Sequence, residues 1–365
     1  DVTYTYDLGN GKTATFTLQS TSCTLTESMV EAIPIQSHTG SEVTPDVTLK
    51  CGDTILQKDI DYTISYASNV EIGTAKVTIT GMGSFTGEIT VPFEIGVAID
   101  AKNFPDETFR TYVQENIDTT ADGILSKRER EGVTQISVSY KEISDLTGVE
   151  YFTVLQRLYC VNNNLTELDV RQNTALQILD CSNNPLTELD VRQNTALITL
   201  DCSYNNLTAL DLTHNLELKS LSCYNNNLTE VEVRQNSALQ ELYCNDNNLT
   251  ALDLSQNTAL QALWCSSNNL IELDLSQNPE LQSLSCSDNQ LTELDVRQNP
   301  ALQKLYCYNN NLTELDVSQN TALQWLNCSD NRYSIDLIGG TFDLSTLPGT
   351  FDVSKASNWT NATVD

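Results

Sequence analysis

The residues best suited to chemistry lie in one loop, residues 118–129. Its oxygen-bearing groups follow the spacing of an EF-hand calcium loop, whose ligands occupy positions one, three, five, seven and twelve. In that order these positions hold Asp118, Thr120, Asp122, the carbonyl of Ile124, and Glu129. With a threonine in place of the usual second carboxylate, the pattern predicts weak Ca²⁺ binding. The alternative is a plain turn, in which Asp118 and Asp122 accept hydrogen bonds from backbone amides.

No group of residues in the sequence suggests catalysis. The two histidines, His38 and His214, lie far apart in the chain. There is no glycine-rich phosphate loop, zinc motif or nucleophile elbow. We therefore predict a protein that is not an enzyme and that uses no cofactor other than Ca²⁺ in that loop.

Nine of the eleven cysteines recur at an unbroken spacing of 21 residues, in the frame Leu-x-x-Leu-x-Cys-x-x-Asn-x-Leu: Cys160, Cys181, Cys202, Cys223, Cys244, Cys265, Cys286, Cys307 and Cys328. Inward side chains of stacked strands point in parallel about 4.8 Å apart, whereas a disulfide needs converging Cβ atoms about 3.8 Å apart. One flat column also cannot supply tetrahedral metal ligands. We expect buried thiols in this column. Whether Cys23 and Cys51 pair is left open.

The 21-residue period predicts a solenoid over residues 155–331, because each coil can bury its apolar side chains only against its neighbours. Within each coil the leucine pattern starts twice, which gives two half-coils of 10 and 11 residues. Each half contains a short alternating run, such as 158–160 and 168–170, and no window has room for a helix. We expect a right-handed solenoid with two parallel sheets back to back.

Polar residues also form columns along the predicted solenoid. Asparagines such as Asn163 and Asn173 follow each strand, where their amides can bond the turning backbone and the next coil. An acidic column extends from Asp169 to Asp316, and arginines such as Arg171 offset part of its self-repulsion. We interpret this column as a solvated face, with weak divalent-cation binding as the alternative.

The outward positions of the cysteine strands vary on an otherwise repetitive frame. Tyrosine and tryptophan concentrate binding energy at interfaces, although they also suit exposed β positions. We predict a ligand face made of Tyr224, Tyr243, Trp264, Ser285, Tyr306, Tyr308 and Trp325. Trp264 and Tyr306 share a column on either side of Ser285, about 9.6 Å apart, which would admit a sugar or planar ring. Ser283 and Ser287 would line the floor of this slot.

Residues 1–97 consist of short β-patterned runs separated by turn residues, which is typical of a β-sandwich. The runs 59–66, 73–81 and 83–87 resemble small immunoglobulin-like modules of Gram-positive surface proteins. Residues 1–20 could form a separate hairpin around Gly9-Asn10-Gly11. Helical patterns at 105–117 and 126–131 flank the calcium-like loop, and this unit is expected to cover the open end of the solenoid.

The repeats resemble the nested leucine-rich repeats of BspA-like and internalin-like bacterial surface proteins, over residues 98–353. The resemblance includes the preceding cap and a C-terminal stretch, 340–353. It implies a secreted or wall-attached binding protein without enzymatic chemistry. The predicted regions are an immunoglobulin-like sandwich (1–97), a helical cap (98–154), the leucine-rich-repeat solenoid (155–331) and a truncated C-terminal cap (332–365), in a mainly β fold.

The formal net charge of −30 disfavours nucleic acid and anionic membrane as partners. The sequence contains no run of 18 apolar residues, so no segment is predicted to insert into a membrane. The combined prediction is an extracellular bacterial protein that recognises a protein or glycan at a cell surface through the cysteine-strand face. The alternative is a structural stalk that presents another domain.

Overall fold

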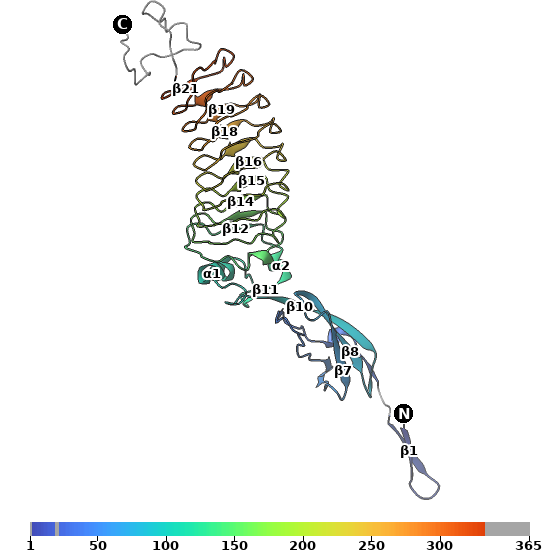
Figure 1. Ribbon diagram of the computed structural model, residues 1–365. Coiled ribbons are helices and arrows are strands. Elements are labelled where there is room, and N and C mark those ends of the chain that lie inside the picture. Colours follow the sequence, from blue (N-terminus) through green and yellow to red (C-terminus); the bar gives the residue numbers. More distant parts are fainter. Residues whose placement is uncertain (1, 19–21, 333–365) are drawn as a thin grey trace, which may run out of the picture. The chain divides into compact units, whose positions relative to one another are not determined.

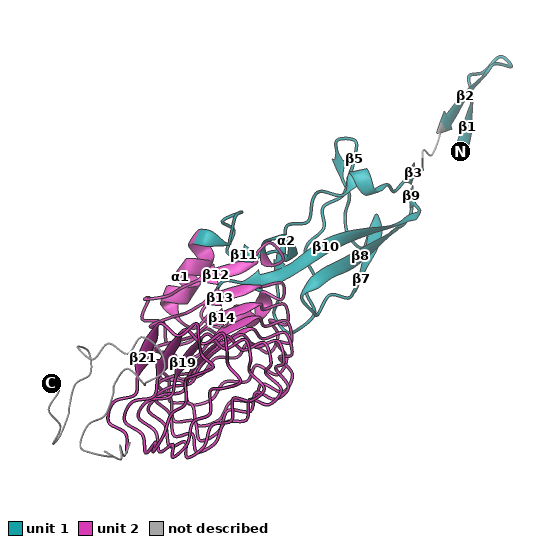
Figure 2. Ribbon diagram, turned by 90° about the horizontal axis from the view of Figure 1, so that it is seen from above, with its two compact units in different colours: residues 1–100, 116–129 teal, residues 101–115, 130–365 magenta. Residues whose placement is uncertain are grey.

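The computed structural model describes residues 2–18 and 22–332, and the chain divides into two compact units (Figures 1 and 2). The first unit comprises residues 1–100 and 116–129, and the second comprises 101–115 and the chain from 130 onward. Residues of the predicted cap, 98–154, therefore occur in both units. The predicted C-terminal cap lies outside the described residues except for Arg332.

The first unit begins with an isolated hairpin. Strands β1 (Val2–Asp7) and β2 (Thr13–Leu18) pair antiparallel, with Tyr4 opposite Phe16. Gly9, Asn10 and Gly11 in the connection all have positive φ, between 60° and 77°. Glycine and asparagine tolerate this conformation better than other residues, which explains why this tripeptide makes the turn.

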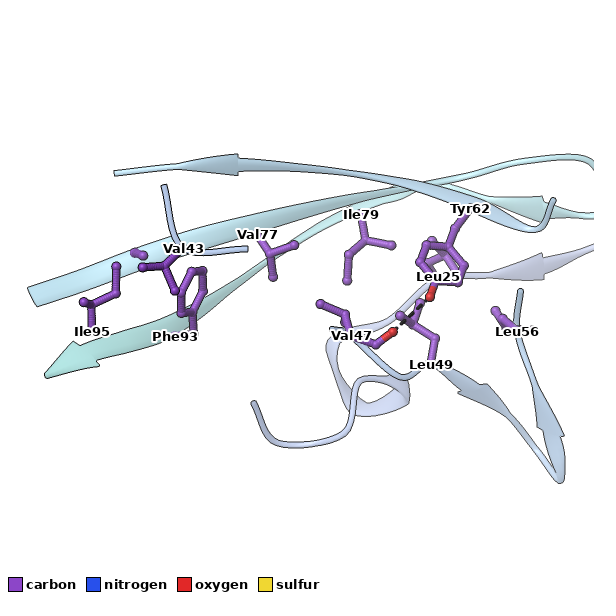
Figure 3. Close-up of a cluster of buried hydrophobic side chains, with 11 residues drawn as sticks. Leu25, Val43, Val47, Leu49, Leu56, Tyr62, Val77, Ile79, Phe93 and Ile95 are labelled. Carbon is purple, nitrogen blue, oxygen red and sulfur yellow. Dashed lines mark hydrogen bonds between the residues drawn. The ribbon is translucent and has the colours of Figure 1, made fainter. Parts of the chain in front are cut away.

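The rest of the first unit is built on an antiparallel sheet of β7 (Tyr62–Ala67), β8 (Gly73–Gly81) and β10 (Glu88–Ala98). Short strands β4 (Gln36–Ser37) and β11 (Ile124–Leu125) pair with β10. One face of the sheet, including Ile79 and Phe93, packs against apolar residues of segment 25–56, such as Leu49 (Figure 3). The sheet forms because alternate strand residues are apolar and can share this core.

The layer opposite this sheet is mostly irregular and contains few strands. It comprises the 3-10 helix η1 (Glu27–Met29) and the two-stranded pairs β3 (Cys23–Thr24) with β9 (Phe85–Thr86) and β5 (Lys50–Cys51) with β6 (Thr54–Ile55). Cys23 and Cys51 form a disulfide, which resolves the pairing that the sequence left open. The unit is therefore a mainly β module whose irregular second layer is cross-linked within itself by a disulfide between β3 and β5.

The predicted helices are present but shorter than expected. Helix α1 (Glu107–Asn116) follows Asp106, whose Oδ1 accepts a hydrogen bond from the Phe109 amide at 3.0 Å. This is the usual role of an aspartate at a helix N-cap. Phe109 and Val113 are the buried face of the helix. Helix α2 (Lys127–Arg130) is a single turn, and η2 (Val149–Tyr151) is a 3-10 turn directly before the first coil.

The second unit is a leucine-rich-repeat solenoid with little helix, as the period predicted. Up to residue 332 it has ten parallel strands: β12 (Gln135–Ser137), β13 (Arg157–Tyr159), β14 (Ile178–Asp180), β15 (Thr199–Asp201), β16 (Ser220–Ser222), β17 (Glu241–Tyr243), β18 (Ala262–Trp264), β19 (Ser283–Ser285), β20 (Lys304–Tyr306) and β21 (Trp325–Asn327). Neighbouring strands pair without offset, so that Leu242 lies beside Leu263. Figure 1 shows these coils stacked one on the next.

The prediction of a second parallel sheet, through runs such as 168–170, was wrong for the described residues. There no strand of the described residues pairs with the neighbouring coil, which is reached only by an asparagine side chain, as where Asn194 Nδ2 donates to the Val170 carbonyl at 2.8 Å. Asp169 Oδ1 accepts a hydrogen bond from the Arg171 amide at 3.0 Å, and the Asn173 amide donates to the Val170 carbonyl at 2.9 Å. A backbone that turns this tightly cannot offer a straight edge to the next coil. The handedness of the solenoid stays a prediction.

Buried asparagines hold the coils together in two columns. In the first column, Asn247 donates through Nδ2 to the Cys223 and Cys244 carbonyls at 3.0 and 3.2 Å. Its Oδ1 accepts from the Leu228 amide at 2.9 Å. Each such side chain therefore satisfies backbone groups of its own coil and of the preceding coil, which would otherwise be buried without partners.

The second asparagine column is bonded at one end only. Asn236 donates through Nδ2 to the Leu212 and Asn215 carbonyls at 3.1 and 2.8 Å. Its Oδ1 is buried and has no hydrogen-bond partner. The same holds for the equivalent oxygens of Asn173, Asn194, Asn215, Asn257, Asn278, Asn299 and Asn320. A buried acceptor without a partner offsets part of the stabilisation that the donated bonds provide.

This difference predicts an order of stability among three alanine variants. Asn247→Ala removes a fully bonded amide and leaves buried backbone groups unpaired, which should lower the free energy of unfolding by about 3 kcal/mol. Asn236→Ala also removes an orphan oxygen and should cost less, about 1–2 kcal/mol. Exposed Asn248→Ala is the control and should change little. Urea denaturation measures all three, and equal losses at 236 and 247 would contradict the account.

The cysteine column consists of buried side chains, as expected. Cys160 to Cys307, at every repeat, are fully buried, whereas Cys328 in the last described coil is only partly buried. Burial raises the pKa of thiols such as Cys160 and Cys181. Both effects keep these groups from reacting as thiolates.

We therefore predict that the folded protein exposes at most one reactive repeat cysteine. Titration of the unreduced protein with a thiol reagent should modify all nine repeat cysteines in denaturant, but none except Cys328 in the native state. Reduction should add the two thiols of Cys23 and Cys51. Rapid modification of several repeat cysteines in the folded protein would show that the column is not a closed core.

Candidate binding face

The predicted ligand residues lie on the outward side of the parallel sheet. In β17, Tyr243 lies between Leu242 and Cys244, both of which are fully buried, so its side chain points away from the core. The strand register then aligns Tyr243, Trp264, Ser285 and Tyr306 in one column across four successive coils. The structure thus brings four of the seven predicted residues into a single row.

The two aromatic residues at one end of this row contact each other. The rings of Tyr243 and Trp264 meet edge to face, with centroids 5.2 Å apart and planes at 83°. This is a preferred geometry for aromatic pairs. Trp264 nevertheless remains 47% exposed, so the pair is pre-ordered and still has surface available for a ligand.

Tyr224 has a partner that sequence reasoning missed. Its ring packs edge to face against Tyr204, with centroids 5.2 Å apart, and Tyr204 is 52% exposed. Tyr204 lies two residues after its cysteine, where every coil has positive φ. The other coils place asparagine, aspartate or serine there, so a tyrosine in that column was the available signal.

The slot between Trp264 and Tyr306 has one hydroxyl group at its centre. Ser285 Oγ lies 2.7 Å from Ser266 Oγ, and the two hydroxyls form a hydrogen bond. Ser287, which was expected to line the floor, is fully buried, and its hydroxyl has no partner. That expectation was wrong for Ser287, whereas Ser283 is partly exposed.

The second predicted aromatic group is less compact. Tyr306 and Tyr308 are half-buried on β20 and the turn after it. Trp325, on the last described strand, is 56% exposed. These residues extend the aromatic character of the face toward the final coil.

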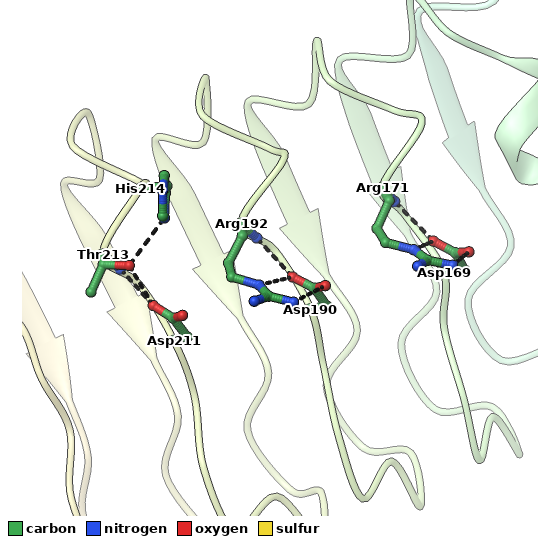
Figure 4. Close-up of polar contacts among 7 residues, drawn as sticks. All are labelled: Asp169, Arg171, Asp190, Arg192, Asp211, Thr213 and His214. Atoms are coloured by element: carbon green, nitrogen blue, oxygen red, sulfur yellow. Dashed lines mark hydrogen bonds and ion pairs between the residues drawn. The ribbon is translucent and has the colours of Figure 1, made fainter.

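The acidic column lies on the side without strands and is explained by the coil itself (Figure 4). Asp190 accepts hydrogen bonds from the Arg192 amide at 3.1 Å and from its guanidinium at 2.9 and 2.8 Å. The guanidinium hydrogen bond, together with the amide, lowers the pKa of Asp190 to about 2. Asp169 with Arg171, and Asp295 with Arg297, repeat this arrangement. The column therefore shapes turns and stays ionised in solvent.

In the calcium-like loop, the structure already satisfies the carboxylates. Asp118 accepts from the Gly123 amide at 2.9 Å, and Asp122 accepts from the Ile124 amide at 2.9 Å. Glu129 accepts six hydrogen bonds, from amides and hydroxyls of Thr119, Thr120 and Ser126. Within residues 2–18 and 22–332, no three histidine, cysteine or acidic side chains gather as metal ligands. This geometry favours the turn, and calcium binding stays a prediction.

Glu129 provides a pH-dependent test of this loop. Burial alone would raise its pKa, but the hydrogen bonds from Ser126, Thr119 and Thr120 lower it from 4.5 to about 2. A carboxylate whose pKa is lower in the folded state stabilises the fold at pH values above its unfolded-state pKa. This stabilisation is lost as the pH falls through the folded-state pKa of about 2. The shift corresponds to roughly 3 kcal/mol.

We expect Glu129→Gln to lower the free energy of unfolding near neutral pH by about 2–3 kcal/mol. The difference from wild type should shrink as the pH falls from about 5 to 2. Urea denaturation across this range measures it, and exposed Glu115→Gln is the matched control. If calcium binds, millimolar Ca²⁺ should raise the melting temperature of wild type but not of Glu129→Gln. A pH-independent difference would contradict the role of this carboxylate.

Comparison with known proteins supports the interpretation of the repeats. A family model of leucine-rich repeats in two copies matches residues 153–194 and 279–320. Internalin J of Listeria monocytogenes serotype 4b (strain F2365) is 41% identical over 71 residues, which are 20% of this chain and 8% of that protein.

Two solved structures are also similar. A functional domain of InlJ from Listeria monocytogenes, which includes a cysteine ladder, is 33% identical, with a TM-score of 0.43; the match covers 66% of this chain and 64% of that one. A leucine-rich repeat protein of Leptospira interrogans is 26% identical, with a TM-score of 0.53, over 56% of this chain and 57% of that one. The chain thus spans less than two thirds of each of these relatives.

In the described residues, the stacked coils and their parallel sheet define a leucine-rich-repeat solenoid. The family model and the repeat identity to Internalin J show that the chain, with its 21-residue repeat and N-terminal β region, is similar to internalin-like bacterial leucine-rich-repeat proteins. Proteins of this kind are non-enzymatic and are typically surface binding or adhesion proteins. No helix among the described residues has the length and apolar character needed to cross a bilayer.

Proposed function

We propose that the chain is an extracellular binding protein that recognises a protein or glycan through the outward face of β13–β21 and acts in adhesion at the bacterial surface. The observation that carries this proposal is Trp264. This residue is 47% exposed, and its ring is held edge to face by Tyr243 on a strand bonded on both sides.

The frame behind this face supports the proposal. Cys223 and Cys244 donate backbone hydrogen bonds to Tyr243 and Trp264 of the following coils, each at 2.8 Å. Side chains on such a frame lose little further freedom on binding, and this lowers the entropic cost of association. Large aromatic side chains that are already ordered are the usual centres of binding energy.

The slot over Ser285 is the proposed centre of recognition. Trp264 and Tyr306 stand one coil to either side of Ser285 in the strand register. The exposed charged residues Lys304 and Glu241 lie on β20 and β17 and could orient a polar ligand. A sugar ring or an aromatic side chain would contact both rings while its polar groups reach the Ser285 hydroxyl.

The cysteine chemistry suits a location outside the cell. A disulfide such as Cys23–Cys51 persists in oxidising compartments. The eight fully buried repeat thiols are shielded from oxidants and need no reducing environment. Internalin homologues are bacterial surface or secreted proteins, which supports the same location for this chain.

The test is a screen of the whole chain against arrays of glycans and of extracellular protein domains, followed by calorimetry on the strongest ligand. Trp264→Ala should weaken binding by more than about 1 kcal/mol, or roughly fivefold. Ser285→Trp should also weaken it by filling the slot. Ile271→Ala removes another exposed apolar side chain, outside the sheet, and should have no effect.

Unchanged affinity in both slot variants would remove the slot from the account. Absence of any ligand in the screen would favour the alternative function, a structural stalk that presents another domain. In either case the variants should stay folded and melt close to the wild-type temperature, because none of the substituted side chains belongs to the buried core.

A further inference from the structure

The outward face carries a pair of carboxylates that the aromatic residues do not explain. Asp180 and Asp201 lie directly beside each other on β14 and β15. Neighbouring strands are about 4.8 Å apart, so two like charges in this position repel each other. Each carboxylate is half-buried, which makes their juxtaposition more unfavourable than it would be for freely solvated groups.

Each of these carboxylates accepts hydrogen bonds through only one of its two oxygens, Oδ1. Asp180 Oδ1 accepts a hydrogen bond from the Ser182 hydroxyl at 2.7 Å. Asp201 Oδ1 accepts from the Ser203 hydroxyl at 2.5 Å and the Ser203 amide at 3.0 Å. These bonds fix both side chains in place on the face. The hydrogen bonds described for these carboxylates all involve Oδ1, so the two Oδ2 atoms are available to a partner.

The pair lacks the cation that similar aspartates of this protein have. Asp169, Asp190 and Asp295 each bind the guanidinium of an arginine two residues on. In the described part of the chain, no lysine or arginine forms an ion pair with Asp180 or Asp201. Burial raises the pKa of Asp201, Ser203 acts against this, and the charge of Asp180 adds to the rise. Free energy would therefore be gained if an external cation neutralised the pair.

Aromatic side chains flank the pair within the same row. Tyr159 lies beside Asp180 in the strand register, and Tyr243 lies two coils beyond Asp201, past Ser222. The Tyr159 ring, which is next to the pair, suits a guanidinium or ammonium group, because such a group can contact an aromatic surface while it binds the acids. Two carboxylates alone are too few for a stable all-protein cage for a divalent metal.

We propose that Asp180 and Asp201 are the docking point for an arginine or lysine side chain of a basic polypeptide partner. This inference rests on the proposed function and narrows it from protein or glycan to a protein with a basic segment. Charge complementarity supports it, because the chain carries a net charge of −30 and would attract such a segment from a distance. The paired acids would then fix where the segment binds.

The test measures binding of a capped peptide of alternating serine and arginine to the whole chain, by calorimetry at about 150 mM salt, where long-range attraction is screened. The double variant Asp180→Asn/Asp201→Asn removes two charges from the face. The matched control, Asp274→Asn/Asp316→Asn, removes two charges from the acidic column, whose aspartates bind the backbone of Ser276 and Ser318. Asparagine can keep those turns.

Wild type should bind the arginine peptide, and the Asp180/Asp201 variant should bind about tenfold more weakly or not at all. The control should change the affinity less than about twofold. A serine–glutamine peptide should not bind. Equal weakening in both double variants would show non-specific attraction to an acidic protein and overturn the proposal. So would an absence of binding by wild type.

Failure of this inference can be distinguished from failure of the proposed function. If the arginine peptide does not bind but Trp264→Ala still weakens an array ligand, only the basic-partner inference is lost. If the peptide binds at Asp180 and Asp201 while the slot variants leave every ligand unaffected, recognition occurs on this face without the slot.

Discussion

The structure of the second unit depends on buried side-chain amides that bond from coil to coil. A solenoid coil must turn its backbone sharply, and each turn directs carbonyl and amide groups toward the interior. Asn163 and its equivalents fill this need with one donor group and one acceptor group. For Asn184, the amide nitrogen reaches the Cys160 and Cys181 carbonyls at 3.0 and 3.1 Å, in two successive coils. The buried cysteine side chains, Cys160 to Cys307 at every repeat, fill the core of each coil beside these asparagines.

A frame held in this way separates stability from recognition. Cysteine and asparagine positions are closely constrained, and leucine positions accept only another apolar residue such as Val231, because each fills a limited volume or bonds a fixed carbonyl. The outward side chains of β13–β21 form few hydrogen bonds with other residues of the solenoid. One example is the bond between the Ser266 and Ser285 hydroxyls. They can therefore change from aspartate to tryptophan between coils while the backbone register stays the same. This freedom allows both the aromatic slot and the acid pair on one sheet.

How far the sequence could predict this molecule follows from the physics of each element. The 21-residue period requires stacked coils, and an in-register stack places the cysteines in one buried column, so both were predictable. The second sheet was not, because Leu168-Asp169-Val170 has the pattern of a strand while the Asp169 carboxylate competes for the Arg171 amide and bends the backbone. Local side-chain bonding decided the outcome, and hydrophobic pattern alone does not show it.

The candidate sites show the same limit. Trp264 and Tyr306 could be placed in one column from spacing alone, since the register follows the period. Tyr204 was marked in the sequence only by being the one tyrosine in its column, and its contact with Tyr224 depends on a positive φ at the turn, which spacing does not show. The spacing of 118–129 indicated a calcium loop, but spacing does not reveal that Glu129 is already bonded to Thr119, Thr120 and Ser126. Which donors satisfy a carboxylate is a property of the folded backbone.

The central claim is that the aromatic row of the sheet binds the partner while the asparagine-bonded frame stays unchanged. Hydroxyl-radical footprinting, with and without the strongest ligand from the array screen, tests this most directly. The account predicts reduced oxidation of Tyr243, Trp264 and Tyr306 in the complex. Exposed Tyr140 and the hairpin residues Tyr4 and Tyr6 should be oxidised as before. Protection confined to those control residues, with Trp264 still fully reactive, would contradict the claim.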